Sequence, residues 1–348
     1  MYLLNVLAAA GLLVSYAAPY VNPDIFWIPA FFGLAYPFLL LANIFFIVYW
    51  LVQMRLKFIM SLLVILSGWK HFSNTVQWGH KNTANQGLKV ITFNVMNFGY
   101  SGNKNTRKDI VELIKDENPD VLCLQDVYTN YAWQYDPIAE IKSAMRSKGV
   151  FFSDVSDKKK IYKLGLVVLS KFPILSTGTV SFGNNTNNHA IWADLNINNQ
   201  KVRVYNVHMQ SIRFGPREYE FLKRIGENSD STINESKTIL RRLKKAFVLR
   251  GQQTDLLKDE MDKSPYPLVV CGDFNDTPVS FTYRKLGEGL IDCFNESGSG
   301  MGRTYAGQFP SFRIDYILHD KSFKSGSFEV INKKLSDHYP VKAMIQLR

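Results

Sequence analysis

The stretch Leu268-Val-Val-Cys-Gly-Asp-Phe-Asn-Asp-Thr-Pro278 passes from an apolar, β-branched run into a polar turn that carries Asp273 and Asn275. Two later stretches, Arg313-Ile-Asp-Tyr-Ile-Leu318 and Ser336-Asp-His338, also place an acid or an imidazole beside an apolar run. A buried strand that ends in a loop gives polar side chains a rigid support from which they reach a substrate. Asp, Asn and His at three such strand ends indicate metal-assisted chemistry on a phosphate ester.

The charges are unevenly distributed along the 348 residues, of which 46% are hydrophobic. Residues 1–80 hold three of the 41 basic and one of the 30 acidic residues, so residues 81–348 keep 38 basic and 29 acidic side chains and a net charge of +9. This predicts an apolar membrane part followed by a moderately basic soluble part, long enough for one large domain or two small ones. The basic surface favours polyanionic partners, namely nucleic acid, anionic lipid head groups or phosphorylated small molecules, without choosing among them.

The N-terminal 80 residues contain three apolar stretches, at about 3–19, 25–52 and 56–72. A membrane-spanning helix needs roughly 20 apolar residues, with about 17 as the lower limit, so the third stretch is marginal. We therefore expect an anchor of two or three transmembrane helices in residues 1–80. A cleaved signal peptide is disfavoured because no positively charged region precedes the first stretch.

The few cations of the anchor predict its orientation. Arg55 and Lys57 lie between the second and third stretches, which favours a cytoplasmic position for that loop. Three spans then place residues 81–348 outside the cytoplasm, whereas two spans place them inside. We favour three spans, and so expect an integral protein of the inner membrane, in contact with membrane lipid, whose soluble domain lies on the extracytoplasmic side.

The remainder of the chain alternates strand-like and helix-like segments after a polar linker from His80 to Gly87. Helical spacing of apolar residues marks 105–117 and 235–263. Neighbouring strand pairs mixed with helices predict an α/β fold with sheet packed on sheet and helices outside. The three cysteines lie in or beside apolar runs and are expected to be core residues, neither disulfide-bonded nor zinc ligands. The strand-like runs are 88–94, 120–125, 165–170, 190–197, 201–208, 267–273, 313–318 and 340–347.

Polar residues recur at the ends of these strands in a fixed order, and the ordered set resembles the endonuclease/exonuclease/phosphatase (deoxyribonuclease I-like) superfamily over residues 88–348. The resemblance implies a four-layer α/β sandwich, with two mainly antiparallel sheets packed together and flanked by helices. It also implies hydrolysis of phosphodiesters or phosphomonoesters with a divalent metal, usually Mg²⁺, with Mn²⁺ as the alternative. The motifs are Thr92-Phe-Asn94, Cys123-Leu-Gln-Asp126, Gly165–Pro173, Asn206-Val-His208, Gly272-Asp-Phe-Asn275, Arg313-Ile-Asp315 and Ser336-Asp-His338.

The resemblance assigns a metal set and a catalytic set. Asn94 and Asp126 are the implied metal ligands, and Asp337 is implied to support a second metal position. The family usually carries glutamate where this chain has Asp126, which is one methylene shorter, so the metal must lie closer to that strand or bind through water. The implied catalytic residues are Asp273, which activates the attacking water, Asn275, which positions it, His208, which donates to the phosphate or the leaving oxygen, and Asp315 with His338, a pair that stabilises charge.

Other residues and the substrate are less constrained. Asn206, Arg303 and Tyr305 are expected to contact the substrate. Asp315 has an alternative interpretation as a buried structural partner of Arg313. We expect a membrane-anchored, nuclease-like, Mg-dependent hydrolase of phosphate esters. The alternatives are a lipid phosphodiesterase or phosphatase of the sphingomyelinase or phosphoinositide type, and a non-catalytic binding or assembly module with an attenuated site.

Overall fold

The computed structural model shows two compact units, each built from more than one segment of the chain. The larger unit comprises Trp78–Gln210, Leu256–Asn275 and Gly289–Arg348, and the smaller comprises Met1–Gln77, Ser211–Asp255 and Asp276–Glu288. Residues 80–85, most of the expected linker, lie outside the described part of the chain. The structure describes residues 1–78, 86–99, 106–130, 135–154, 162–183, 186–212, 214–215, 218, 220, 231–307 and 310–347.

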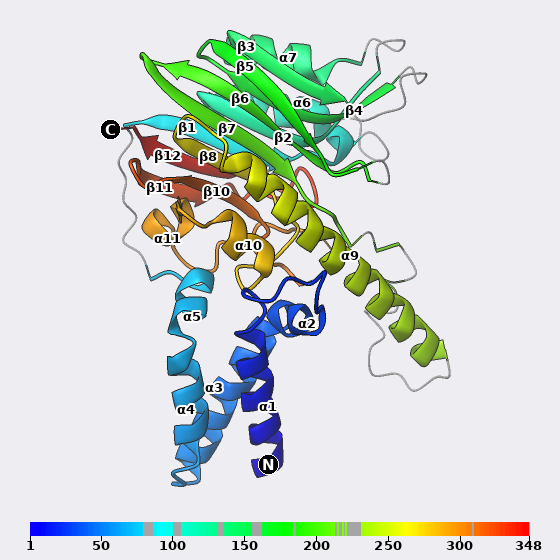
Figure 1. Cartoon of the computed structure of the whole chain (residues 1–348), viewed down its shortest axis with the longest axis vertical. Helices are drawn as coiled ribbons and strands as arrows, with labels where there is room; N and C mark the ends of the chain where they lie inside the picture. Colours follow the sequence, from blue (N-terminus) through cyan, green and yellow to red (C-terminus); the bar gives the residue numbers. More distant parts are fainter. Residues whose placement is uncertain are drawn as a thin grey trace. The chain divides into compact units, whose positions relative to one another are not determined.

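The larger unit contains two six-stranded sheets (Figure 1). The first sheet has the strand order β11-β12-β1-β2-β4-β3, and the second has the order β5-β6-β7-β8-β10-β9. The strands of the first sheet are β1 (Leu88–Asn94), β2 (Val121–Asn130), β3 (Gly149–Asp154), β4 (Tyr162–Ser170), β11 (Lys324–Val330) and β12 (Val341–Gln346). Those of the second are β5 (Ile174–Ser181), β6 (His189–Ile197), β7 (Gln200–His208), β8 (Leu268–Asp273), β9 (Leu290–Asp292) and β10 (Asp315–Asp320).

Each sheet combines antiparallel pairs with a parallel pair at its centre. β1 runs parallel to β2, and β7 runs parallel to β8. A parallel pair needs a long crossover, and the chain supplies one through helix α6 (Thr106–Glu117) in the first case and helix α9 (Ser231–Met261) in the second. Because the carboxyl ends of parallel strands meet at the same edge, the polar residues that end β7 and β8 lie side by side.

Two apolar clusters hold the larger unit together. One fills the space between the sheets and includes Val90, Cys123, Val204, Cys271 and Ile317. The other packs the opposite face of the first sheet against α6 and helix α7 (Pro137–Met145). The expected sandwich of two sheets flanked by helices is thereby confirmed. All three cysteines are buried and free. A 3₁₀ turn, η1 (Met96–Gly99), follows β1, and helix α11 (Cys293–Ser297) follows β9.

Several strands lack the apolar run that would have predicted them. β3 and β5 are partly or fully exposed along most of their length, and β11 buries only Ser325 and Gly326. All three lie at or near the edges of their sheets, where hydrogen bonding to one neighbour does not require an apolar sequence.

The smaller unit is helical. Its helices are α1 (Tyr2–Ser15), α2 (Ile28–Leu34), α3 (Tyr36–Val52), α4 (Phe58–Ser67), α5 (Trp69–Thr75), α10 (Phe281–Leu286) and the part of α9 up to Asp255. α2 and α3 meet at Ala35 with a bend of 64°. Pro37 has no N–H to donate into the preceding turn, which accounts for the break.

These helices are shorter than the expected spans. The stretch at 3–19 becomes a 14-residue helix, and the stretch at 56–72 is divided between α4 and α5 at Gly68. Among the described residues, no single helix has both the length and the apolar composition to cross a bilayer, whereas the bent pair α2–α3 meets both criteria.

Polar side chains occupy the interior of this helical bundle. Asn5 Nδ2 donates to Ser61 Oγ at 2.6 Å, and Ser61 Oγ donates to Asn43 Oδ1 at 2.9 Å. Trp50 Nε1 donates to Asn5 Oδ1 at 2.8 Å, and Asn43 Nδ2 donates to the Ala8 and Leu39 carbonyls. The network joins α1, α3 and α4, which lie side by side in Figure 1. The outward faces of the same helices carry exposed large apolar side chains, among them Leu3, Leu7, Phe38, Leu41, Phe45, Val48, Leu51, Leu63 and Leu66.

Candidate active site

A row of ionisable residues crosses four adjacent strands of the second sheet. His189 on β6 pairs in register with His208 on β7, His208 pairs with Asp273 on β8, and Asp273 pairs with Asp315 on β10. Residues that pair directly across strands project from the same face of a sheet. Ile191, Cys271 and Ile317, each two residues away along its strand on the same face, belong to the apolar core between the sheets. The row is therefore the polar end of that core.

The first sheet contributes Asn94 and Asp126. Asn94 ends β1 and is 4% exposed, and its register partner on β2 is Gln125. The register with β4 shifts between Leu124 and Val127, and within this bulge Asp126 adopts a left-handed φ of 51°. Bulges redirect side chains locally. The carboxylate of Asp126 is 39% exposed, in contrast to its buried neighbours.

The carboxylate of Asp273 is the centre of the arrangement. Its Oδ2 lies 3.1 Å from Asn94 Nδ2, 2.9 Å from Asn275 Nδ2, 3.6 Å from His208 Nε2 and 3.7 Å from His338 Nε2. Its Oδ1 accepts the backbone N–H of Asn275 at 2.8 Å. Asn275 has a left-handed φ of 53°, which turns both of its donors toward the carboxylate. Burial raises the pKa of Asp273 to about 6, although His338 and His208 act to lower it. Such a carboxylate is charged at neutral pH and basic enough to accept a proton.

Asp315 and His338 form a buried pair. His338 Nδ1 lies 2.9 Å and 3.1 Å from the two carboxylate oxygens of Asp315. Burial opposes a charge on His338, but Asp315 and Asp273 outweigh it and raise the pKa of His338 to about 10. The alternative pairing of Asp315 with Arg313 is wrong, because Arg313 Nη1 contacts Asp292 Oδ2 at 2.6 Å instead.

His208 connects the two acidic parts of the site. Its Nδ1 lies 3.5 Å from Asp126 Oδ1 on the first sheet, and its Nε2 lies 3.6 Å from Asp273 Oδ2 on the second. The side chain is 9% exposed. His208 therefore lies within ion-pair distance of both carboxylates, and a substrate oxygen can replace one of them while the other stays close.

A divalent cation fits the oxygen-rich side of the site. Asp126 and Asp273 supply carboxylates, and the Asn94 amide nitrogen lies 3.5 Å and 3.1 Å from them. The amide oxygen of Asn94 accepts the backbone N–H of Met96 at 3.1 Å. Hard cations such as Mg²⁺ prefer such donors. Asp337 is half-buried and accepts from Ser336 Oγ at 3.1 Å, and no hydrogen bond or ion pair joins it to these three residues within the described chain.

A second group also has suitable spacing. Ligand atoms of Asp273, Asp315 and His338 all lie within 4.8 Å of one another. A metal bound there would have to displace a proton from His338, whose pKa the two carboxylates raise to about 10.

The three residues that were expected to contact the substrate lie in different environments. Asn206 is fully buried, and its Nδ2 donates to the carbonyls of Leu124 and Val167 while its Oδ1 accepts from Gln125 Nε2 at 2.6 Å. Asn206 thus links the two sheets, and its donors and acceptor are not available to a phosphate. Tyr305 packs its ring edge against His338 at 5.5 Å, whereas Arg303 is exposed.

The sequence motifs did not include His189, although the sequence contains a signal that predicts its position. Asn198 and Asn199 both have positive φ and form a two-residue turn between β6 and β7. Such a turn fixes the register of a hairpin, and this register places His189 opposite His208. Burial lowers the pKa of His189 to about 4, so its ring is neutral at physiological pH.

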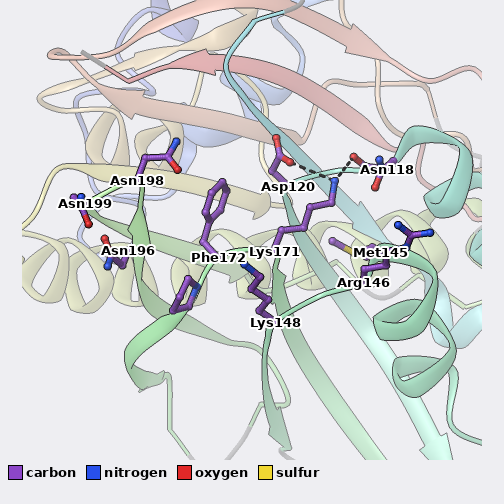
Figure 2. Close-up of a pocket in the computed structure, with 11 residues that line it drawn as sticks. Asn118, Asp120, Met145, Arg146, Lys148, Lys171, Phe172, Asn196, Asn198 and Asn199 are labelled. Atoms are coloured by element: carbon purple, nitrogen blue, oxygen red, sulfur yellow. Dashed lines mark hydrogen bonds and ion pairs between the residues drawn. The ribbon is translucent and has the colours of Figure 1, made fainter.

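A pocket of about 610 Å³ lies at the opposite ends of the strands (Figure 2). It adjoins the start of β2, the end of β4 and the turn between β6 and β7. Lys171 contacts Asp120 and the carbonyl of Asn118 there. Asp120 is the only acidic side chain among its lining residues, and none of them is a histidine, so the pocket lacks the groups that converge on Asp273.

Comparison of the chain with known families gives two matches. A model described as Endonuclease/Exonuclease/phosphatase family matches residues 91–338. A model described as Domain of unknown function (DUF8431) matches residues 1–75. No curated protein matches the chain.

Solved structures with the same fold have low sequence identity. An endonuclease/exonuclease/phosphatase from Bacteroides vulgatus is 17% identical, with a TM-score of 0.55, over 76% of this chain and 100% of that one. A mannosyl-6-phosphatase from Bacteroides thetaiotaomicron is 16% identical, with a TM-score of 0.52, over 74% and 99%. The human Nocturnin catalytic domain with bound sulfate is 17% identical, with a TM-score of 0.52, over 75% and 95%.

Proposed function

The chain belongs to the endonuclease/exonuclease/phosphatase family, and on this premise we propose that it is a divalent-metal-dependent phosphoesterase that hydrolyses phosphodiester bonds in the manner of a nuclease. Members of the family are hydrolases that act on phosphoesters. The observation that carries the proposal is the convergence of Asn94, Asn275, His208 and His338 on one carboxylate oxygen of Asp273.

Asp273 is the proton acceptor in this proposal. Its raised pKa leaves it ionised at neutral pH and matched to the removal of a proton from water. Asn275 fixes the carboxylate through its backbone N–H and its amide, so the basic oxygen has a defined direction. A water molecule hydrogen-bonded to Asp273 would attack the phosphorus atom as its proton moves to the carboxylate.

The two histidines face the charge that develops on the phosphate. His338 is held as an imidazolium by Asp315, so it offers a preorganised positive charge next to Asp273. His208 would donate to a phosphate oxygen or to the leaving oxygen. Asn94 and Asp126 would hold Mg²⁺, or Mn²⁺ as the alternative, which neutralises charge on a non-bridging oxygen when bound.

The proposal is tested with the full-length chain in detergent micelles. The substrates are bis(p-nitrophenyl) phosphate, plasmid DNA and RNA, each with Mg²⁺, with Mn²⁺ or with a chelator. We expect metal-dependent turnover and a loss of about 10²–10⁴-fold in Asp273→Asn. Asp262→Asn, which alters an exposed carboxylate, is the matched control. Turnover that survives chelation, or that is unchanged in Asp273→Asn, contradicts the mechanism.

We also propose that the N-terminal helices sit in lipid. A bundle in water buries apolar residues and exposes polar ones, yet here the Asn5–Ser61–Asn43 network is inside and large apolar side chains are outside. Polar residues that join helices internally are typical of helices packed in a membrane. This arrangement supports the second candidate function, a lipid phosphodiesterase or phosphatase. Turnover of sphingomyelin or phosphoinositide vesicles, with none of plasmid DNA, would favour it over a nuclease.

The cations support an orientation for these helices. Lys57 lies over the rings of Tyr2 and Trp50 at 4.8 Å and 4.9 Å, so it shares one end of the bundle with the N-terminus of the chain. Arg55 lies in the same loop, and cationic ends favour the cytoplasmic side. We propose an inner-membrane protein whose catalytic residues are extracytoplasmic. A reporter fused after residue 85 that is active only in the cytoplasm would contradict this orientation.

A further inference from the structure

The N-terminal helices share a compact unit with two segments of the family domain, 211–255 and 276–288. The first contact between these segments and the N-terminal helices involves α9. Asn22 Nδ2 donates to Asp255 Oδ2 at 2.7 Å, and Gln252 Nε2 donates to Asp24 Oδ1 at 2.9 Å. A Cβ placed on Gly251 would lie 2.3 Å from Asn22 Oδ1, so a side chain there would require Asn22 to move.

The second contact involves the segment 276–288, which directly follows Asp273 and Asn275. Val279 is 1% exposed and packs in a cluster with Leu12, Tyr36 and Leu40. A Cβ placed on Gly33 would lie 2.3 Å from the carbonyl oxygen of Val279. The backbone directly after Pro278 is therefore held by α1, α2 and α3. The carbonyl oxygen of Val279 lies so close to Gly33 that no space is left for a side chain on that glycine.

A buried ion pair holds the start of the same segment. Arg250 Nε lies 3.1 Å from Asp276 Oδ2, and the Arg250 side chain is 1% exposed. The guanidinium lies over the ring of Phe247 at 5.1 Å, and that ring meets Phe31 of α2 edge-on at 5.0 Å. The position of Asp276 thus depends on α9, which itself packs on the N-terminal helices.

Asp276 is covalently joined to Asn275, which orients the carboxylate of Asp273. Asn275 has a left-handed backbone, a conformation that asparagine adopts more readily than other side-chain-bearing residues. We infer that the N-terminal helices are a positioning element of the candidate active site, acting through residues 276–288. The catalytic consequence of this inference rests on the proposed function. The inference goes beyond that function because it gives the N-terminal region a role in the geometry of the site as well as in anchoring.

The test compares two identical substitutions in the full-length chain in detergent micelles. Gly33→Ala places a methyl group against the backbone of Val279, whereas Gly11→Ala meets the flexible end of Leu39 at 3.1 Å. Hydrogen exchange of residues 268–280 and the kinetics of bis(p-nitrophenyl) phosphate hydrolysis are measured for both. We expect Gly33→Ala to speed exchange in 268–280 and to lower kcat about tenfold or more with little change in KM. Gly11→Ala is expected to change neither.

A milder variant covers the case in which Gly33→Ala does not fold. Val279→Ala removes the side chain from the Leu12–Tyr36–Leu40 cluster and is expected to act in the same direction, with exchange in β2 unchanged. Unaltered exchange in 268–280 in every folded variant overturns the inference. If the native chain turns over no ester, the proposed function fails, while the exchange data still decide whether the N-terminal helices hold the turn.

Discussion

His338 contacts both carboxylate oxygens of Asp315 through Nδ1, and the two side chains are 5% and 1% exposed. Asp315 lies on the second sheet, and His338 precedes the β12 strand of the first. The pair therefore joins the two sheets at the end where Asp273 lies. It also keeps a cation in the interior, which is stable only because two carboxylates surround it.

The pair predicts an alkaline limit to activity. If His338 must be protonated, turnover falls as the pH rises through about 10, the pKa that Asp315 and Asp273 maintain. Asp315→Asn removes the charge that most strongly raises this pKa, so the limit shifts to lower pH. A pH profile of kcat/KM for the two proteins measures the shift. An alkaline limit at the same pH in both proteins would show that His338 does not act as a cation.

Substitutions at Asp126 report on metal binding. Asp126→Ala removes a carboxylate from the oxygen donors around Asn94, and we expect the Mg²⁺ concentration for half-maximal activity to rise about 10–100-fold. Asp126→Glu extends the carboxylate across gaps of 3.5 Å to Asn94 and His208, so we expect it to lower that concentration. Metal titrations of activity give both values. Equal requirements in the native protein and Asp126→Ala would exclude this residue as a ligand.

The polar network among the N-terminal helices is expected to stabilise them. Asn43→Ala removes two donors and leaves Ser61 Oγ without its acceptor, which we expect to lower the free energy of unfolding by about 1–2 kcal/mol. Ser67→Ala is the control, because that exposed hydroxyl only bonds within its own helix. Denaturant unfolding in micelles compares the two. An Asn43→Ala protein as stable as Ser67→Ala would mean that the network contributes nothing.

Removal of residues 1–77 is expected to destabilise the family domain. Val279 loses its packing against Leu12, Tyr36 and Leu40, and Phe247 loses Phe31, so apolar side chains become exposed. We expect residues 78–348 to aggregate or to unfold at a lower temperature than the full-length chain. Light scattering and thermal unfolding in the same detergent measure this. A truncated protein of undiminished stability would argue that the N-terminal helices act only as an anchor.

Much of the larger unit could be predicted because its information is local. Apolar β-branched runs predicted the central strands, and the polar residues that end them marked Asn94, His208, Asp273 and Asp315 as candidates. The edge strands β3 and β5 escaped prediction because their residues are too exposed to carry an apolar pattern. The N-terminal apolar stretches were recognised, but their breaks at Ala35 and Gly68 depend on packing and on proline geometry.

Contacts between side chains that lie far apart in the sequence could not be predicted from such local patterns. Arg313 lies two residues from Asp315, yet its guanidinium pairs with Asp292 of β9, while Asp315 pairs with His338 from the far end of the chain. Asn206 and His208 share a motif and a face, but Asn206 lies one step deeper, where the two sheets close over it.

The family, the sheet-forming segments and the chemical character of the site could be predicted, because all three are recorded in local patterns of apolar runs and the polar residues that end them. The fold alone shows which carboxylate His338 contacts and that residues 276–288 pack with the N-terminal helices. Those relationships depend on strand register and on packing between residues distant in the chain. Neither leaves a trace in any single stretch of sequence.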